Sequence, residues 1–193
     1  MARPREFSET KVLEQAMEVF WTKGYEATSL VDLIRAMGIS KSSFYEAFGS
    51  KHELFIDAIE SYIETRVGFV VNLLDRELSG KRAIENIFRI ILEMETSEAG
   101  GRGCLLCNCA VEISRRDPEA AALVAGGMRR LEDAYFRAVE RGQAAGEIRA
   151  DRDARALARF LVSSENGMMV MAKANPDREG ISDIARISLS VLE

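Results

Sequence analysis

Residues 28–54, TSLVDLIRAMGISKSSFYEAFGSKHEL, predict two short helices joined by a tight turn. Apolar residues recur every three or four positions in the first half of this segment, on one face of a helix: Leu30, Leu33, Ile34 and Met37. Ser29 is the expected N-cap of that helix. Gly38 follows the last apolar residue, where a residue without a Cβ readily adopts the left-handed conformation that ends a helix. The segment therefore has the pattern of a helix-turn-helix.

The second helix of this segment begins after Ser40, its expected N-cap. Its outward-facing residues are Lys41, Ser42, Ser43 and Tyr45, and its inward-facing residues are Phe44, Ala47 and Phe48. Such a helix fits the major groove of DNA. After Gly49, Ser50 and Glu53 predict a capping box for the next helix, with Lys51 in its first turn. A helix N-terminus with a lysine is a favourable site for a phosphate.

A resemblance to a known family rests on these residues. The run ATSLVDLIRAMGISKSSFYEAFGSKHELF, residues 27–55, resembles the DNA-binding segment of the TetR/AcrR family of bacterial transcriptional regulators. The shared features are a threonine before the first helix, the glycine at the turn, the aromatic residues of the second helix and the Phe-Gly-Ser-Lys run. The likeness is specific over roughly the first 60 residues, and beyond them only the pattern of helices is shared.

The resemblance implies an all-α protein with two domains. Residues 1–50 would form a three-helix DNA-binding domain with a helix-turn-helix, and residues 51–193 a helical domain for effector binding and dimerisation. The implied partners are double-stranded DNA with a palindromic operator, a second copy of the chain and an unknown small-molecule effector. The implied function is a sequence-specific transcriptional regulator, a repressor that a small molecule releases from its operator.

The resemblance also assigns roles to single residues. Lys41, Ser42 and Glu46 are candidates for contacts with base edges, and Thr28, Ser43, Tyr45 and Lys51 for contacts with phosphates. Glu46 is unusual, because its carboxylate would either accept a hydrogen bond from a cytosine amino group or turn to solvent. The two cap residues, Ser29 and Ser40, complete the expected DNA-facing surface.

Composition agrees with a helical protein. The chain has 193 residues, 47% of them hydrophobic, and only three prolines. Without sustained period-two alternation, its apolar pattern predicts about nine helices. The sequence has no leader-like start and no uncharged run near the about 18 apolar residues of a membrane span. We therefore expect a cytoplasmic protein without a membrane partner.

The net charge of −5 does not by itself favour nucleic acid. The first 55 residues hold seven Lys and Arg against eight Asp and Glu, so DNA binding depends on where the charges lie. Glu9, Glu14 and Glu18 of the first helix must face away from DNA. Arg3 and Arg5 precede that helix and would either reach the DNA backbone or minor groove or belong to a tail without a role.

The remainder of the chain predicts a helical body. One helix is expected from Lys51 to about Glu77, long enough to join the DNA-binding unit to the body. Asp117 and Pro118 mark another helix start. The last two helices carry small residues, either for close contact with a second copy or for the core of one chain: Ser164, Gly167, Ala172, Ala185 and Ser188. We favour the homodimer.

Three cysteines, Cys104, Cys107 and Cys109, invite three interpretations. As small apolar residues they would pack a helix. Cys104 and Cys107 share a helix face and would form a redox or electrophile sensor. Thiolate metal sensing is the third possibility, but Cys109 points elsewhere and His52 is the only histidine. We expect no metal site.

Apolar and aromatic residues of the body are candidates for the lining of an effector cavity: Phe88, Met94, Met128, Tyr135, Met168 and Met171. No nucleophile elbow, phosphate-binding loop or metal-ligand spacing is present, so we expect neither an enzyme nor a cofactor. The alternative from another class is an all-helical adaptor that binds partner helices and no DNA.

Overall fold

The computed structural model describes residues 9–97 and 100–193, and every regular element in these two ranges is a helix. Arg3 and Arg5 lie outside the described residues. The α-helices are α1 (Glu9–Lys23), α2 (Leu30–Met37), α3 (Lys41–Phe48), α4 (Lys51–Tyr62), α5 (Gly68–Arg76), α6 (Gly80–Glu95), α7 (Leu105–Glu112), α8 (Pro118–Ala144), α9 (Ala154–Ala174) and α10 (Arg178–Leu189). A π-helical turn spans Ile63–Val67, and a 3₁₀ turn spans Ser190–Leu192. The predicted all-α fold is confirmed.

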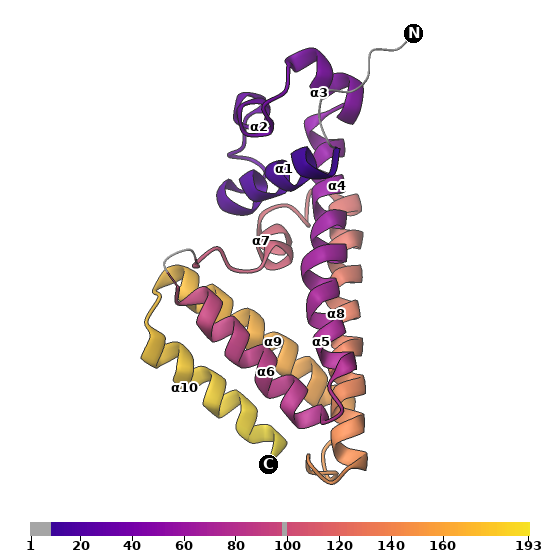
Figure 1. Cartoon of the computed structure of the whole chain (residues 1–193), viewed down its shortest axis with the longest axis vertical. Coiled ribbons are helices and arrows are strands. Elements are labelled where there is room, and N and C mark those ends of the chain that lie inside the picture. The colour runs from indigo at the N-terminus through magenta and orange to yellow at the C-terminus, as the bar shows by residue number, and fades with distance from the viewer. Residues whose placement is uncertain (1–8, 98–99) are drawn as a thin grey trace.

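The long helix expected from Lys51 forms as one rod with an irregular centre. The π-helical turn joins α4 to α5 without a break in the chain direction (Figure 1). Counted as one element, this rod brings the described helices to the nine that the sequence predicts. Within the rod, the hydroxyl of Thr65 donates to the Ser61 carbonyl. Such π turns inside α-helices are often found at functional sites, and periodicity alone does not reveal them.

The head of the molecule comprises α1, α2, α3 and the first turns of α4 (Figure 1). Ser29 caps α2 through a complete capping box with Asp32, and Gly38 ends α2 in the left-handed conformation at φ +64°. The inward side chains of α3, Phe44 and Phe48, are buried as predicted. Phe55 of α4 packs edge-on against Phe20 of α1, with 5.1 Å between the ring centroids. The first turns of α4 therefore complete the core of the head.

The helix starts predicted from sequence are present, with one difference. Asp117 caps α8 and accepts from the amides of Glu119 and Ala120, with Pro118 at the first helical position. At α4, Ser50 Oγ accepts from the Glu53 amide at 3.0 Å, which is half of the expected capping box. The Ser50 amide donates to the Phe48 carbonyl and not to the Glu53 carboxylate. The tight turn after α3 uses that donor, so the second half does not form.

The body surrounds the rod. Helix α8 runs alongside α4 and α5, and α6, α9 and α10 form a block that packs against its lower half (Figure 1). Helix α7 lies between the head and this block. No helix in the described ranges is long and apolar enough to cross a membrane.

Candidate DNA-binding and effector sites

The polar face of α3 is open to solvent. Lys41, Ser42, Tyr45 and Glu46 are exposed, with 48% of Tyr45 accessible. At the start of the helix, Ser40 Oγ accepts from the Ser43 amide at 3.1 Å and lies within 2.9 Å of the hydroxyls of Ser42 and Ser43. Short polar side chains thus surround the N-terminus of α3. A protruding helix with this face can enter a DNA groove.

Lys51 lies in the first turn of α4, beside the end of α3. Its ammonium group is 4.2 Å from the centre of the Tyr25 ring, a cation–π contact that holds the charge near the helix N-terminus. The first-turn amides and this ammonium together form a site of positive potential.

Two of the expected DNA-facing residues have other roles. Thr28 is 1% exposed, and its hydroxyl donates to the Gly24 carbonyl, so no donor remains for a phosphate. The prediction for Thr28 was therefore wrong. Ser29 is exposed, but its amide and its hydroxyl both donate to Asp32, which also accepts from Lys23 at 2.7 Å. The amide and the hydroxyl of Ser29 are therefore both used in the cap of α2. Both residues fix the position of α2 against α1.

The acidic residues of α1 face the body, as DNA binding requires. Glu18 forms an ion pair with Arg102, and the guanidinium of Arg66 lies 3.7 Å from both Glu14 and Glu18. Arg66 belongs to the rod and Arg102 to the segment before α7, so both carboxylates point away from α3. For Glu9 the orientation stays a prediction.

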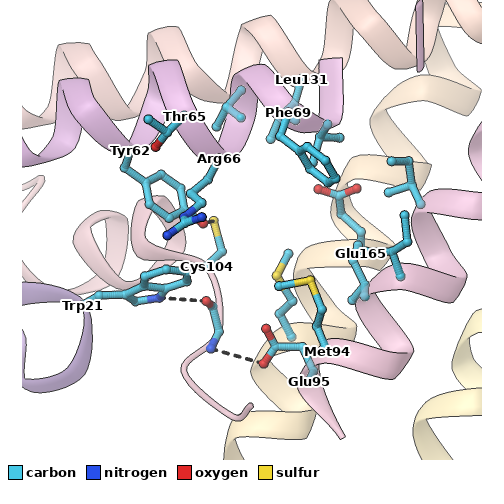
Figure 2. Close-up of a pocket in the computed structure, with 17 residues that line it drawn as sticks. Trp21, Tyr62, Thr65, Arg66, Phe69, Met94, Glu95, Cys104, Leu131 and Glu165 are labelled. Carbon is cyan, nitrogen blue, oxygen red and sulfur yellow. Dashed lines mark hydrogen bonds between the residues drawn. The ribbon is translucent and has the colours of Figure 1, made fainter. Parts of the chain in front are cut away.

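A cavity of about 380 Å³ lies where the head meets the body (Figure 2). Its walls come from α1, the rod, α6, the start of α7, α8 and α9. Most of the lining is apolar or aromatic, and the principal such residues are Trp21, Tyr62, Val67, Phe69, Val70, Ile87, Ile90, Ile91, Met94, Leu131 and Met169. The polar side chains are Thr65, Arg66, Glu95, Cys104 and Glu165. Apolar walls with a few polar groups are typical of small-molecule sites.

The six residues predicted to line a cavity are mostly elsewhere, and only Met94 lines it. Phe88 and Met168 are fully buried in the core, and Met171 is 52% exposed on α9. Met128 is half-buried beside Asn166, whose amide is 3.9 Å from its sulfur. Tyr135 is fully buried and reaches the cavity only through its hydrogen bond to Glu165. Helical spacing identified apolar residues but not which of them border an empty volume.

The lining residues that sequence reasoning missed come from three distant segments. Trp21 lies on the apolar face of α1, and Tyr62 on that of α4, where nothing distinguishes them from core residues. Glu165 did carry a signal, because an acid on the face that holds Leu161 and Met168 is unusual in a buried helix.

Two acidic side chains in the cavity are nearly inaccessible to solvent. Glu165 is 3% exposed, and the hydroxyl of Tyr135 donates to its Oε2. Burial raises the pKa of Glu165 to about 8. Glu95 is 8% exposed and accepts from the amides of Gly101 and Gly103 at 3.2 and 3.4 Å. Burial also raises the pKa of Glu95. The cavity thus holds two carboxyl groups that resist ionisation.

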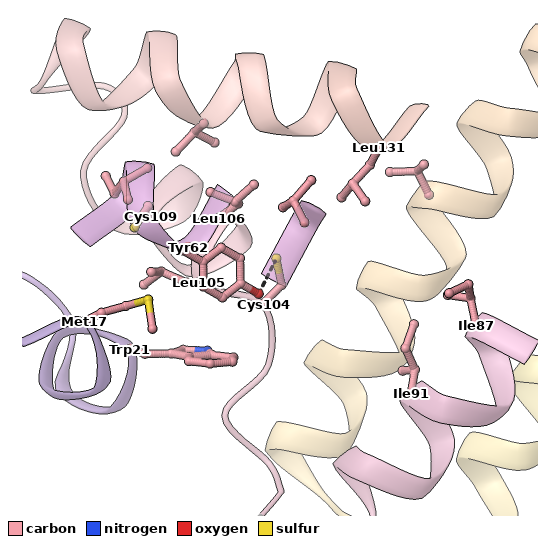
Figure 3. Packing of buried hydrophobic residues seen from close by; sticks show 14 of the residues in the cluster. Met17, Trp21, Tyr62, Ile87, Ile91, Cys104, Leu105, Leu106, Cys109 and Leu131 are labelled. Atoms are coloured by element: carbon pink, nitrogen blue, oxygen red, sulfur yellow. Dashed lines mark hydrogen bonds between the residues drawn. The ribbon is translucent and has the colours of Figure 1, made fainter. Parts of the chain in front are cut away.

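The cysteines occupy three different environments. Cys104 lines the cavity and is 3% exposed, and the hydroxyl of Tyr62 donates to its sulfur at 3.7 Å (Figure 3). Hydrogen bonding from Cys107, with a further contribution from Tyr62, lowers the pKa of the Cys104 thiol. Asn166 Oδ1, 3.0 Å from the Cys107 sulfur, is an alternative acceptor for the same thiol hydrogen. Burial raises the pKa of Cys109 to about 12. In the described ranges, no three potential metal ligands cluster.

Helix α7 connects the cavity to the head. At its N-terminal end, the indole nitrogen of Trp21 donates to the Gly103 carbonyl at 2.8 Å. At its C-terminal end, the carboxylate of Glu112 accepts from the amides of Tyr25 and Glu26 at 3.1 and 2.9 Å. These bonds fix both ends of α7 to α1 and the loop after it. A displacement of α7 would therefore be transmitted to the DNA-binding helices.

Comparisons with known proteins agree with this architecture. The family model for bacterial regulatory proteins of the tetR family matches residues 12–58, and the model for the tetracyclin repressor-like C-terminal domain matches residues 80–187. The chain is 36% identical to the HTH-type transcriptional regulator YezE of Bacillus subtilis (strain 168), over the whole of both chains. It is 30% identical to the HTH-type transcriptional repressor ComR of Escherichia coli (strain K12), covering 97% of this chain and 90% of ComR.

A solved structure extends the likeness to three dimensions. A cysteine mutant of the TetR family regulator CifR, in complex with 26-base-pair operator DNA, superposes with a TM-score of 0.88 at 30% identity. The match covers 99% of this chain and 100% of the CifR chain. From its helix-turn-helix, its two matched domains and these relatives, the chain belongs to the TetR family of bacterial regulatory proteins, and it is a DNA-binding transcriptional regulator.

Proposed function

We propose that this chain is a repressor that binds a palindromic operator as a homodimer and leaves it when a small molecule enters the cavity. One observation carries the proposal: the cavity is bordered both by the body and by Trp21 of the head, so a ligand there contacts the DNA-binding unit directly. ComR, a relative along nearly the whole chain, is a transcriptional repressor. The regulator would act in the cytoplasm, where bacterial DNA lies, and we propose no enzymatic activity for it.

We propose that α3 enters the major groove. Lys41, Ser42 and Glu46 are exposed on one side of it and would reach base edges. The hydroxyl and ammonium groups that would hold phosphates belong to Ser40 and Ser43 at the start of α3, Tyr45 on its exposed face and Lys51 at the start of α4. We take residues 1–50 as the DNA-binding domain and 51–193 as the effector and dimerisation domain, with α4 shared between them.

The homodimer is proposed from an apolar face on the last two helices. Phe160 and Val170 of α9 are 45% and 53% exposed, and Ile187 of α10 is 59% exposed. Gly167 lies between the first two on the same face of α9, with open space above its backbone. Ala172, Ala185 and Ser188, which the sequence suggested for this contact, are buried within the chain and belong to its own core. The larger exposed residues would form the interface.

A gel-shift titration tests the proposal. The purified chain should retard a duplex from its own upstream region, and its affinity should fall steeply as salt increases because phosphate contacts release counterions. Adding the effector should release the duplex. If no genomic duplex is retarded even at low salt, the proposed operator binding is overturned.

A thiol sensor is the second candidate, because Cys104 is the cysteine that lines the cavity. Its thiolate would react with an oxidant or a soft electrophile, and the added group would press on Trp21 and Tyr62. Alkylation should release DNA from the unaltered chain but not from Cys104→Ser. Cys109→Ser is the matched control, since Cys109 is buried in the core away from the cavity and should change nothing.

A further inference from the structure

The carboxyl group of Glu165 is directed into the cavity with one oxygen unused. Its Oε2 accepts from Tyr135, whereas Oε1 has no hydrogen-bond partner among the described residues. In Figure 2 this carboxyl lies beside Phe69, across the cavity from Tyr62 and Cys104. A carboxyl that is 3% exposed and borders an apolar space is costly to keep ionised, because it has lost water without gaining a cation. The site lacks a positive partner for this group.

A second carboxyl group faces the same space. Glu95 uses Oε2 for the amides of Gly101 and Gly103, and the charge of Lys173 acts on it from a distance, without an ion pair in the described ranges. The one basic side chain in the lining, Arg66, is largely exposed and lies close to Glu14 and Glu18 of α1. The cavity therefore combines two buried acids with an arginine whose charge other carboxylates already balance.

Other titratable groups surround Glu165 from each packed helix. Tyr135 of α8 is bonded to it, and the remaining ones are Tyr62 of α4, Arg66 of the π-helical turn, Glu95 of α6, and Cys104 and Cys107 of α7. Except for Arg66, each of these side chains is neutral when protonated and negative when ionised. Apart from Arg66, whose charge is close to Glu14 and Glu18, none of these groups offers Glu165 a positive partner.

We propose that this cavity binds a lipophilic organic cation, an ammonium head on an apolar body, and that the head pairs with Glu165. The inference rests on the proposed function of the cavity as the effector site and specifies the chemical class of the effector. Trp21, Tyr62 and Phe69 supply aromatic rings for the apolar body and for cation–π contact. A volume of about 380 Å³ suits a body of one or two rings.

Binding of such a cation is coupled to release of a proton. The empty site holds Glu165 protonated below pH 8, since burial raises its pKa to about 8. When the cation enters, the O–H proton of Glu165 passes to solvent and the carboxylate pairs with the ligand, so no covalent bond to the ligand forms or breaks. Over this range the affinity for a permanent cation should rise about tenfold per pH unit. A neutral acceptor would instead take a hydrogen bond from the protonated acid and bind better at low pH.

A matched pair of probes separates charge from shape. Benzyltrimethylammonium and neopentylbenzene have the same outline and differ by one positive charge, and benzylacetone serves as the neutral acceptor. Trp21 is the only tryptophan of the chain and lines the cavity, so its fluorescence reports binding directly. At pH 8 the cation should bind at least about tenfold more tightly than neopentylbenzene, as expected for an ion pair in a site that excludes water. Equal affinities, or tighter binding of benzylacetone, would overturn the inference.

The Glu165→Gln variant tests whether the carboxylate of Glu165 binds the cationic head. Glutamine keeps an oxygen for Tyr135 but cannot ionise, so the preference for the cation should fall and its pH dependence should disappear. Glu64→Gln is the matched control, because Glu64 is exposed and pairs with Arg130 outside the cavity, and it should bind as the unaltered chain does. If Glu165→Gln does not fold, titration calorimetry of the unaltered chain in two buffers of different ionisation enthalpy measures how many protons are released when the cation binds. Absence of proton release at pH 7 would overturn the inference.

A parallel operator-binding assay distinguishes this inference from the function on which it rests. If benzyltrimethylammonium binds through Glu165 but leaves the operator complex intact, the cation site is supported and the effector role fails. If neopentylbenzene releases the operator as well as the cation does, the effector role is supported and the cation inference is overturned.

Discussion

The proposed phosphate contact of Lys51 depends on how its neighbours hold the side chain. Its ammonium group is held over the Tyr25 ring at the N-terminus of α4, so the charge is fixed while its hydrogen-bond donors remain available. A phosphate bound here would gain both the ammonium and the first-turn amides. Such a contact carries no information about base sequence.

Replacement of Lys51 by alanine should therefore weaken binding to specific and random duplexes by the same factor. The slope of log affinity against log salt should become shallower by about one unit, because one fewer counterion is released. Fluorescence anisotropy at several salt concentrations measures both quantities. Lys81→Ala removes the same charge at the start of α6, far from α3, and should leave the slope unchanged. A change in sequence preference alone would exclude the phosphate role.

Glu165 should make the stability of the protein depend on pH. Its folded pKa of about 8 lies above its ordinary value, so the folded state holds the proton more tightly than the unfolded chain does. The protonated form contributes full stability below about pH 4.5, and this contribution is lost as the pH rises through 8. Relative to Glu165→Gln, the unaltered chain should lose about 1.4 kcal/mol per pH unit between these limits. Urea unfolding at pH 5, 6.5 and 8 measures the difference, and parallel curves would contradict it.

Residues whose roles depend on nearby sequence were predictable, and those whose roles depend on distant contacts were not. Ser40, Phe44 and Gly38 have positions set by the helix period and the turn, so spacing identified their roles. Glu165 and Trp21 meet at the cavity only because α9 and α1 are brought together by the body. At Thr28 the family resemblance was misleading: it predicted a contact with a DNA phosphate, whereas the hydroxyl donates to the Gly24 carbonyl within the head.

At the scale of elements, α7 is a short link that holds the head against the body. Glu112 accepts two amides of the loop after α1, and a buried or half-buried acceptor of this kind stabilises by about 1 kcal/mol for each bond. Glu112→Ala should therefore speed amide exchange in α1 and α2 and weaken the response of operator binding to an effector. Glu140→Ala, an exposed acid of α8, is the matched control. An unchanged response would show that α7 does not transmit the signal.

Two glycines of different helices should respond unequally to alanine. At Gly80 a Cβ would collide with the carbonyl oxygen of Ala138 and lie 2.6 Å from the Gly142 amide nitrogen, so α6 would have to move away from α8. At Gly38 nothing lies within 4 Å, and only the left-handed φ of +64° opposes a side chain. Gly38→Ala should cost about 1 kcal/mol of unfolding free energy and Gly80→Ala several times more, as thermal melts would show. Equal losses would contradict this packing.

The sequence identified the elements better than their irregularities. Caps and helix ends follow from single residues, as Asp117 and Pro118 of α8 do. The π-helical turn in the rod has no such marker, because its residues keep the helical apolar pattern while the backbone adds one residue. The turn contributes Thr65, Arg66 and Val67 to the cavity, so this irregularity is part of the site.

At the scale of the whole molecule, the proposed homodimer makes operator binding depend on the pairing of two chains. Phe160→Glu places a charge in the exposed apolar face of α9 and should give single chains in analytical ultracentrifugation, since burying an unpaired carboxylate is costly. Affinity for a two-half-site operator should fall by more than about tenfold, because each half would then bind alone. Leu78→Glu, in the exposed segment between α5 and α6, should alter neither property. A dimeric Phe160→Glu chain would exclude this face as the interface.

The rod α4–α5 has a consequence for the exchange of parts between relatives. Phe55 completes the core of the head, so a graft that ends at residue 50 would leave a donor head without its own supporting helix. A junction placed within the π-helical turn, Ile63–Val67, would carry the whole hydrophobic unit across. Chimaeric regulators that join one operator specificity to another inducer should therefore be spliced at the π-helical turn, whose first residue, Ile63, lies 15 residues after Phe48, the last residue of α3.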